Sequence, residues 1–511
     1  MKRGTLPSLL LALALLLTAC GGAQQAESAP PSASPAPEAE ETAVPMAFVL
    51  PCYPSGGFHP ITGTNRTNLT LAPLLYRGLF FIDAQFQPQG ELCQSFTVSE
   101  DGLSWTFQLA PASFSDGSPL TSAEAAASLE LARKSERYAA RLSAVSRVTA
   151  GADAVTVTLS KPNGNLPALL DVPIVKETAD PLCPLGTGPY ALDAAGEALR
   201  LIARTGVGVP LAEIPLHAIG ASDDLVYAFD AREISLVDTD LTGTSALGYS
   251  GRFETTDYAT STLLYVGFNA QSGPCRDELV RRAVSCAFDR SGIAGSLLAG
   301  HAAAAALPVH PDAAESAAGP EAALEADPEQ ARSLLEQAGW TGQAGEKLRK
   351  GRSALELTLA VNLESTYKVA VAESLAAALE ALGCTVTVSK LPWDSFLSAL
   401  QKRSFDLYLG ETTLTADFDP EPLVGSAGAL NYGGFLDSET NALLDAWRGA
   451  AGADRTAAAA ALQARLTQTA PIAPLCFKNG SLLTQWGQVS GAQPTQRDVF
   501  AALSGWQIAQ F

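Results

Sequence analysis

Strand and helix patterns alternate between residues 355 and 409, and this alternation constrains the fold more than any other feature of the chain. Three short runs of aliphatic and β-branched residues have the length of strands: 355–361, 386–388 and 405–409. The segments between them, 368–382 and 394–400, carry apolar residues at helical spacing. A helix that joins two strands of one sheet places them in parallel through a right-handed crossover. The sequence therefore predicts an α/β lobe with a parallel or mixed sheet.

The stretch 261–300, at the middle of the chain, has the pattern of a joint between two bodies. A β-rich run over 262–268 is followed by turn-forming residues and then by helical spacing. Asp277 and Asp289 are each placed to cap a helix, and Gly300 is placed to end the second one. We expect a single strand to leave one body here and to deliver the chain into another.

The N-terminus has the features of an export signal. Lys2 and Arg3 precede an apolar run that is too short to cross a bilayer core. The small residues before Cys20 resemble the lipobox of bacterial lipoproteins, which implies a signal peptide over 1–19 and a lipid on Cys20. A plain secretory signal is the alternative. Residues 20–45 are rich in Ala, Pro, Glu and Ser, so we expect a disordered tether outside the cytoplasm.

Composition limits the partners of the folded part, which begins near residue 46 and is long enough for two or three domains. The formal net charge of −20 argues against nucleic acid as a partner. Beyond Cys20, seven scattered cysteines contain no Cys-x-x-Cys pair, so we expect neither a zinc site nor a disulfide framework, but small buried side chains. These seven are Cys52, Cys93, Cys183, Cys275, Cys286, Cys384 and Cys476.

Motifs of enzymes are missing from the sequence. Only four histidines are present, without a His-Glu-x-x-His pair, and there is no Gly-x-Ser-x-Gly nucleophile elbow. We therefore predict no catalytic residue, no metal and no cofactor. Paired carboxylates act through their positions in space, so a surface hydrolase stays open as an alternative.

Five blocks of sequence resemble, in order, those of the peptide- and nickel-binding family of ABC-transporter solute receptors. Each alone is a set of turns and helix caps, but five in register are specific. The blocks are LLYRGLFFID at 74–83, SEDGLSWTFQLAPASFSDGSPLTSAE at 99–124, LGTGPY at 185–190, YVGFNAQSGPCRDELVRRAVSCAFDR at 265–290 and DPEQARSLLEQAGW at 327–340.

The resemblance implies a two-lobed α/β fold of the periplasmic-binding-protein type (class II) with the ligand cleft between the lobes. Lobe I would have a core and an extra subdomain over 71–184, and lobe II would span 266–479. The lobe I core would combine 46–70, 185–265 and 480–511. Such receptors close on a solute by hinge motion and present it to a membrane permease. We expect a monomer.

The resemblance also points to a ligand site on the loop after the strand 405–409. Similar peptide receptors carry a Trp-x-Ala-Asp-aromatic motif here, whose Asp binds the α-ammonium group of the peptide. Asp417 matches that Asp, because alanine precedes it and an aromatic residue follows it. The Trp is missing, however, and Asp417 or Asp419 has the alternative role of shaping the turn before Pro420.

Five further residues complete the predicted ligand site. Glu411 and Asp419 add carboxylates to the same loop, and such a group suits a cationic solute. Asn431 and Tyr432 have side-chain types that line polar clefts, and the loop 55–65 brings Thr64 and Asn65. A core or turn role is the alternative for Asn431 and Tyr432, and an ordinary surface loop is the alternative for 55–65.

The predicted function is that of a lipid-anchored receptor for peptides or small cationic solutes, which delivers them to an ABC permease. A receptor for a metal chelate or an opine is the alternative within the class. A surface hydrolase or a ligand sensor without transport is the alternative outside it.

Overall fold

The computed structural model describes residues 47–180, 183–195, 198–243, 248–318, 323–343 and 345–509. The predicted signal peptide, Cys20 and the predicted tether lie outside the described residues. We describe the part from Pro45 onward by itself, because the chain divides into the units Met1–Val44 and Pro45–Phe511. No helix in the described ranges is both long and apolar enough to span a membrane.

A seven-stranded mixed sheet is the largest element of this part, with the order β11-β19-β12-β18-β16-β17 and β13 added on β19. Its strands are β11 (Leu236–Thr239), β12 (Phe253–Phe268), β13 (Ala302–Ala304), β16 (Glu356–Asn362), β17 (Thr385–Leu391), β18 (Leu407–Thr413) and β19 (Ile472–Gln485). β16 pairs in parallel with β17 and β18, and the other pairs are antiparallel. The prediction of an α/β lobe with a mixed sheet is confirmed.

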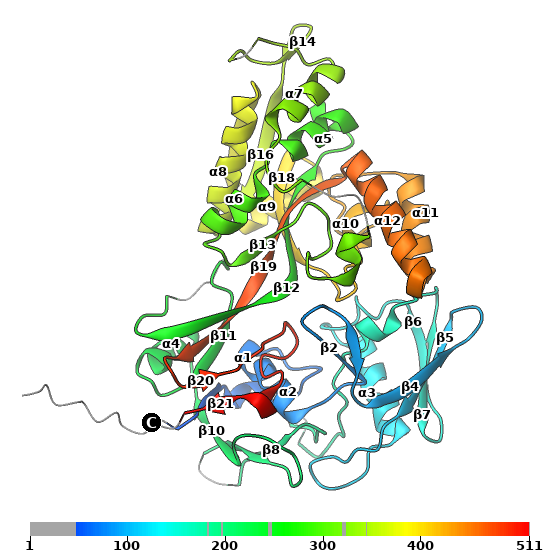
Figure 1. Cartoon of the computed structure of the whole chain (residues 1–511), viewed down its shortest axis with the longest axis vertical. Coiled ribbons are helices and arrows are strands. Elements are labelled where there is room, and N and C mark those ends of the chain that lie inside the picture. The colour runs from blue at the N-terminus through cyan, green and yellow to red at the C-terminus, as the bar shows by residue number, and fades with distance from the viewer. Residues whose placement is uncertain are drawn as a thin grey trace, which may run out of the picture. The chain divides into compact units, whose positions relative to one another are not determined.

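Two long strands, β12 and β19, run side by side through the whole of this sheet (Figure 1). They pair from Phe253↔Gln485 to Ala259↔Asn479, and a β-bulge follows before pairing resumes at Thr262↔Lys478. Before the bulge β19 also pairs with β11, and after it β12 also pairs with β18. We use this bulge to name two lobes: the first lobe is 47–259 with 479–509, and the second lobe is 260–478.

The predicted strand carries the chain from one body into the other as β12, and its antiparallel partner β19 brings the chain back. The predicted lobe boundaries at 265 and 480 fall within these two strands. The apolar run that becomes β19 lies about 200 residues after β12 in the sequence, so no local pattern joins the two.

Helices cover the sheet of the second lobe. They are α5 (Glu278–Cys286), α6 (Arg290–Gly292), α7 (Pro328–Gln337), α8 (Thr366–Ala381), α9 (Trp393–Lys402), α10 (Glu421–Val424), α11 (Ser438–Gly449) and α12 (Gly452–Thr469). Both predicted caps are confirmed: the carboxylate of Asp277 accepts from the Leu279 amide, and that of Asp289 accepts from the Gly292 amide. Gly300 adopts a left-handed φ of 83° where the second segment ends.

The first lobe contains two four-stranded sheets. One has the order β1-β10-β9-β8, from β1 (Leu50–Cys52), β8 (Tyr190–Asp193), β9 (Arg200–Ala203) and β10 (Glu213–Ala218). The other has the order β4-β5-β7-β6, from β4 (Cys93–Val98), β5 (Ser104–Leu109), β6 (Val145–Ala150) and β7 (Ala154–Leu159). The second of these sheets packs on α3 (Ser122–Lys134), which opens with the capping box of Thr121 and Glu124.

Shorter elements complete the first lobe. They are α1 (Arg66–Thr70), α2 (Ala72–Leu75), the hairpin of β2 (Phe80–Ile82) and β3 (Pro88–Gly90), and α4 (Ser222–Asp230). The segment 223–241, which the sequence pattern did not place, folds as α4 and β11. The first lobe also contains the pair of β20 (Val489–Ser490) with β21 (Gln507–Ile508), and the second lobe contains the pair of β14 (Arg349–Lys350) with β15 (Ser353–Ala354).

The seven cysteines within the described residues are all free thiols. Five of them are buried, as predicted: Cys52, Cys93, Cys275, Cys384 and Cys476. Cys183 and Cys286 are only partly buried. Burial raises the pKa of the Cys52 thiol to about 11, so this group stays protonated and unreactive at neutral pH.

Candidate functional site

A cavity of about 440 Å³ lies where β12 and β19 cross from one lobe to the other. The first lobe supplies most of its wall, and the second lobe supplies the ends of β12, β18 and β19 around the bulge. The lining residues are Thr64, Arg66, Leu69, Thr70, Arg137, Asp238, Asp240, Tyr258, Thr260, Thr262, Glu411, Thr413, Lys478, Asn479, Gly480, Gln496, Arg497 and Val499. We call this cavity the cleft. Clefts between lobes, at the carboxyl ends of strands, are common ligand sites in α/β proteins.

A smaller cavity of about 190 Å³ shares part of this wall. Arg66, Thr70 and Asp238 line both cavities, and Tyr53 and Tyr249 line only the smaller one. The space available to a solute therefore continues from the cleft into the first lobe, beside α1.

Lys478 is the central charged group of the cleft. Its side chain is only 3% exposed, and Nζ donates to Asp240 Oδ2 over 2.7 Å and to Glu411 Oε2 over 3.4 Å. Lys368, at the start of α8, places a second ammonium 3.3 Å from the same oxygen of Glu411. Asp240 belongs to the first lobe and Glu411 to the second, so the Lys478 ammonium bridges the two across the bulge.

Asp238 is the third carboxylate of the cleft, and it is held by hydroxyl groups. Tyr258 donates to Oδ1 over 2.5 Å, and Thr70 donates to Oδ2 over 3.3 Å. Burial raises the pKa of the Asp238 carboxyl above its usual range. Burial and the neighbouring Asp238 raise the pKa of Tyr258, so the phenol remains a hydrogen-bond donor.

Two arginines of the cleft make no hydrogen bond to these carboxylates, although the charge of the Arg66 guanidinium opposes the burial that raises the pKa of Asp238. The side chains of Arg66 and Arg137 make no hydrogen bond and no ion pair within the described ranges, although the Arg137 guanidinium lies 5.6 Å from the centre of the Tyr138 ring. Arg497 Nε lies 3.0 Å from Asp171 Oδ2, and Asp171 also pairs with Arg141. The acidic groups of the cleft are thus already paired, whereas two guanidinium groups remain available to an anion.

Of the predicted site residues, Thr64 and Glu411 line the cleft. Asn65 lies next to Thr64, but its side chain caps α1 by accepting from the Asn68 amide over 3.0 Å. Cys20, the predicted lipidation site, lies outside the described residues.

The structure places the carboxyl of Asp417 away from the cleft, inside the second lobe. Its residue is 7% exposed and lines a separate cavity of about 30 Å³ with Glu315, Trp447 and Gln463. Burial, with a contribution from the charge of Asp419, raises the pKa of Asp417 to about 6. Oδ1 has no hydrogen-bond partner among the residues that the structure describes. This geometry differs from the ammonium site that the resemblance implied.

Asp419 also lies outside the cleft. Its Oδ2 accepts from Arg448 Nε over 2.7 Å, and its Oδ1 accepts from the Glu421 amide at the start of α10. The three acids are therefore not brought together: Glu411 lies on β18 and faces the cleft, whereas Asp417 and Asp419 lie in the loop after β18 and are directed into the second lobe. Phe418, between the two aspartates, has a left-handed backbone with φ 56°.

Asn431 and Tyr432 have structural contacts. The Asn431 amide donates to the carbonyls of Gly425 and Phe435 and accepts from the Phe435 amide, so it holds a turn. The Tyr432 ring packs edge-on against Tyr408 at 6.2 Å. Neither residue lines the cleft.

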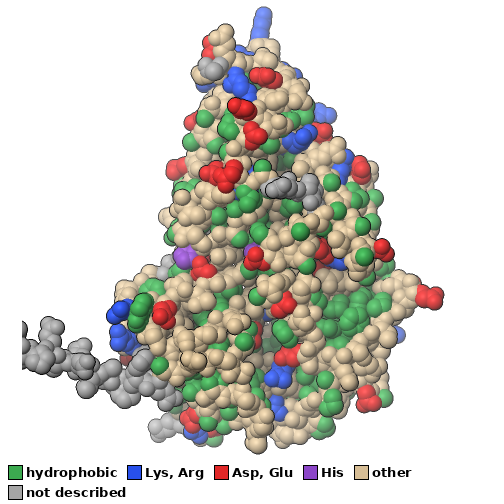
Figure 2. Space-filling view, in the orientation of Figure 1, with side chains coloured by type: hydrophobic (Ala, Val, Ile, Leu, Met, Phe, Trp, Pro, Cys, Tyr) green, Lys and Arg blue, Asp and Glu red, His purple; other side chains and the backbone are tan. Residues whose placement is uncertain are grey.

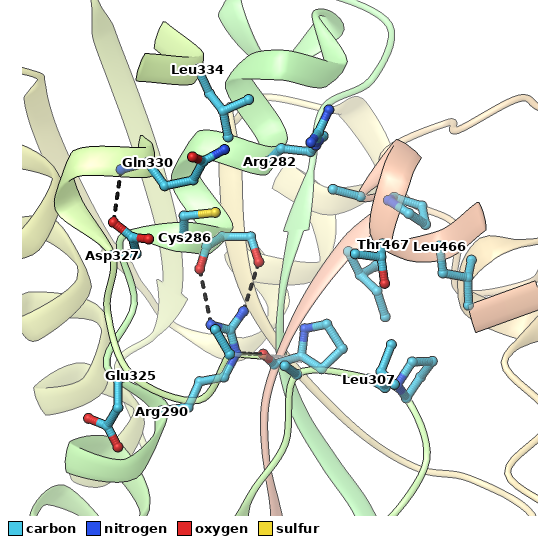
Figure 3. A pocket seen from close by; sticks show the side chains of 18 residues that line it. Arg282, Cys286, Arg290, Leu307, Glu325, Asp327, Gln330, Leu334, Leu466 and Thr467 are labelled. Atoms are coloured by element: carbon cyan, nitrogen blue, oxygen red, sulfur yellow. Dashed lines mark hydrogen bonds between the residues drawn. The ribbon is translucent and has the colours of Figure 1, made fainter. Parts of the chain in front are cut away.

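A third cavity, of about 250 Å³, lies on the second lobe between α5, α7 and α12 (Figure 3). Its most prominent polar group is Arg290, and the guanidinium donates to the carbonyls of Pro474 and Ser285 and to the Ser285 hydroxyl. The Asp327 carboxylate caps α7 by accepting from the Gln330 amide. These groups are already occupied by the fold, so the cleft is the better candidate for a ligand.

The charge of the surface does not mark the site either. On the face seen in Figure 2, acidic and basic side chains are scattered and form no single patch.

The sequence did not predict Arg66, Arg137 and Lys478 as residues of the cleft, because they lie far apart in the chain. A signal existed for Lys478, because it is a single lysine within the apolar run of β19.

With this geometry established, comparison with known proteins identifies the family. The model of the bacterial extracellular solute-binding proteins, family 5, matches residues 87–432, which is more than half of the chain. The chain belongs to this family. The predicted fold class, a two-lobed solute-binding protein, is thereby confirmed together with the family predicted from the sequence blocks.

Individual relatives match part of the chain at low sequence identity. A Brucella ovis protein with a provisional name as an ABC transporter peptide-binding protein is 29% identical over 319 residues, which cover 57% of this chain and 59% of that protein. A glutathione-binding protein of Shigella flexneri is 24% identical over 311 residues, covering 55% and 59%. The chain thus matches less than two thirds of the length of these curated relatives.

A solved structure supports the fold over nearly the whole chain. The NikA protein of Brucella suis, in complex with Fe(III)-EDTA, superposes with a TM-score of 0.70 at 21% identity, covering 91% of this chain and 99% of that one. At this identity the likeness concerns the fold alone.

Substitution of Lys478 tests the bridge between the lobes. We expect Lys478→Met to lower the free energy of unfolding by about 1–3 kcal/mol, because it leaves Asp240 without its cation, while Glu411 keeps Lys368. Urea unfolding followed by circular dichroism measures the change. The control Lys390→Met removes an exposed pair with Glu373 and should cost less than about 1 kcal/mol. Equal losses in both variants would contradict a special role for Lys478.

Substitution of Asp417 tests its buried state. A carboxyl whose pKa is about 6 in the fold, against an ordinary value of 3.8, binds its proton more tightly when the protein is folded. The free energy of unfolding therefore falls as pH rises from about 4 to about 6. We expect Asp417→Asn to lack this fall and to gain about 1–3 kcal/mol over the original protein across the same range.

Urea unfolding at pH 4, 5, 6 and 7 measures this difference, and the exposed Asp153→Asn is the matched control. If Asp417→Asn and the original protein keep parallel pH profiles, Asp417 is not the buried titrating group that the geometry describes.

Proposed function

We propose that this protein is an extracytoplasmic receptor that captures a small solute with a carboxylate group and delivers it to the permease of an ABC importer. The observation that carries the proposal is the cleft: it lies between the lobes of a family 5 solute-binding protein, and hydrogen-bonding side chains from both lobes line it. A solute that touches both lobes favours the closed arrangement over the open one.

The choice of a carboxylate comes from the charges of the cleft. Asp238, Asp240 and Glu411 each have a donor already, so a cationic solute would compete with existing partners. The guanidiniums of Arg66 and Arg137 have no such partner, and a guanidinium binds a carboxylate through two parallel hydrogen bonds. This replaces the cationic solute of the sequence-based hypothesis with a zwitterionic or anionic one.

Peptides fit this chemistry because each has a C-terminal carboxylate. The named relatives are peptide-binding and glutathione-binding proteins, and glutathione carries two carboxylates. A chelate whose metal is held by carboxylates presents the same group to the arginines, as Fe(III)-EDTA would. We infer that the solute is peptide-like, with such a chelate as the second candidate.

The setting of the receptor follows from the N-terminal sequence and the named relatives. We infer that Cys20 carries the lipid anchor, that the residues after it form a tether, and that the monomer meets its permease at the membrane. A receptor of this kind releases its solute unchanged, in contrast to a surface hydrolase.

Native mass spectrometry of the protein purified from its own host is the direct test. We expect a co-purified molecule with at least one carboxylate, and its mass also distinguishes a peptide from a metal chelate. A solute without any anionic group would contradict the proposal. Incubation with the identified solute should leave its mass unchanged, and hydrolysis would identify an enzyme.

The arginines are tested with a pair of synthetic solutes. We expect trialanine to bind more tightly than trialanine amide, and we expect Arg66→Ala and Arg137→Ala each to weaken trialanine binding about 10- to 100-fold, the loss of one charge-assisted contact. Isothermal titration calorimetry measures both. Arg349→Ala, on the exposed strand β14, is the matched control and should leave the affinity unchanged. Equal affinities for acid and amide would show that the arginines do not bind the carboxylate.

A further inference from the structure

The hairpin of β2 and β3 carries an aromatic side chain from the first lobe to the second. Phe86 lies in its turn, with φ 61°, a conformation that is strained for a bulky residue. The Asp83 carboxylate holds this turn by accepting from the amides of Gln85 and Gln87 over 3.0 and 2.8 Å. These hydrogen bonds stabilise the turn and the position of Phe86 within it.

The Phe86 ring completes an aromatic cluster that otherwise belongs to the second lobe. Its centre lies 4.7 Å from that of Phe418, edge to face, and 5.1 Å from that of His310. Both of these rings also contact Phe477 of β19, at 5.6 and 5.2 Å. Phe86 is only 5% exposed, although its hairpin is part of the first lobe. Edge-to-face packing at this distance is favourable beyond the burial of apolar area.

Another phenylalanine of the same hairpin is not buried. Phe81 lies on β2, five residues before Phe86, and remains 45% exposed. Its neighbour Ile82 is buried with Phe86 in the cluster of the second lobe. Ile82 and Phe86 are thus buried against the second lobe, whereas Phe81 between Phe80 and Ile82 remains exposed to solvent.

A second contact between the lobes lies close to the same loop region. The Gly164 amide of the first lobe donates to the Arg448 carbonyl of the second lobe over 2.6 Å. A Cβ atom on Gly164 would lie 1.9 Å from the Ala450 carbonyl oxygen, so only glycine permits this approach. Arg448 in turn binds Asp419, next to Phe418. Phe86 and Gly164 therefore contact residues of the second lobe that are themselves linked, through the hydrogen bond between Arg448 and Asp419.

We propose that Phe86 is a latch that holds the two lobes closed, with the contact at Gly164 as its companion. Both contacts join segments outside the β12–β19 pair, and the proposal is that a rotation of the lobes about that pair breaks them. The loop after β18, which carries Phe418, serves closure in this protein. The latch acts on the lobes themselves and does not depend on which solute occupies the cleft.

The consequence is a bias toward closure in the protein without solute. If the cleft binds a solute most tightly when closed, a latch that populates the closed state raises the apparent affinity, and its removal lowers it. Loss of one such aromatic contact corresponds to about a 3- to 10-fold weaker affinity.

Small-angle X-ray scattering of the solute-free protein, stripped of bound solute by unfolding and refolding, tests the latch. We expect Phe86→Ala to have a larger radius of gyration than the original protein, and Phe86→Leu to have an intermediate one. The matched control Phe81→Ala, on the same hairpin, should leave the radius unchanged. Circular dichroism spectra confirm that each variant is folded.

Gly164→Ala provides an independent variant in case Phe86→Ala does not fold. The added methyl group clashes with the Ala450 carbonyl only when the lobes are closed, so we expect this variant to expand as well. The proposal is overturned if the folded variants match the original protein in radius, or if Phe81→Ala expands as much as Phe86→Ala.

Discussion

The antiparallel pairing of β12 with β19 is the constraint on which the rest of the structure depends. Each strand contributes to both lobes, and the bulge between Ala259 and Thr262 is where their pairing is interrupted. Side-chain hydrogen bonds stabilise the backbone at this bulge: Thr260 donates to the Lys478 carbonyl over 2.6 Å, and Gln496 accepts from the Ser261 amide over 3.1 Å. Thr260, Lys478 and Gln496 also line the cleft, so the residues that stabilise the crossing of the strands lie in the wall of the candidate site.

The net charge of the whole chain differs from the arrangement of charges inside the cleft. The chain carries a formal charge of −20, and the cationic solute was predicted from the carboxylates at Glu411, Asp417 and Asp419. Inside the cleft, each carboxylate is paired with an ammonium or a hydroxyl group, and among the described residues the guanidiniums of Arg66 and Arg137 make no hydrogen bond or ion pair, although the charge of Arg66 acts on Asp238. A fully buried ion pair interacts strongly over a few ångströms, whereas surface charges are screened beyond about 10 Å at moderate salt. The local arrangement decides what binds, and the overall charge governs solubility.

Sequence analysis succeeded where structure is local. The strands and helices between 355 and 409, the caps at Asp277 and Asp289, and the capping box at Thr121 depend on residues within a few positions of one another, and the structure contains them all. The cleft is different, because Arg66, Arg137, Glu411 and Lys478 come from four distant segments. Their meeting depends on the return of β19 beside β12, which no local pattern reveals. Of the predicted ligand residues, only Thr64 and Glu411 lie on the cleft wall.

The loop after β18 gives Asp417 surroundings that differ from the ammonium site implied by the resemblance. The tryptophan of the motif is absent, Phe418 adopts a left-handed conformation, and the Asp417 carboxyl is directed into the second lobe. The aromatic ring of Phe418 then faces Phe86 of the first lobe, and Asp419 is held by Arg448 beside the second contact between the lobes. A loop with these contacts is suited to joining the lobes. In the function proposed above, the arginines of the cleft hold the carboxylate of the solute, so a peptide would be bound by its C-terminal end and not by its ammonium group.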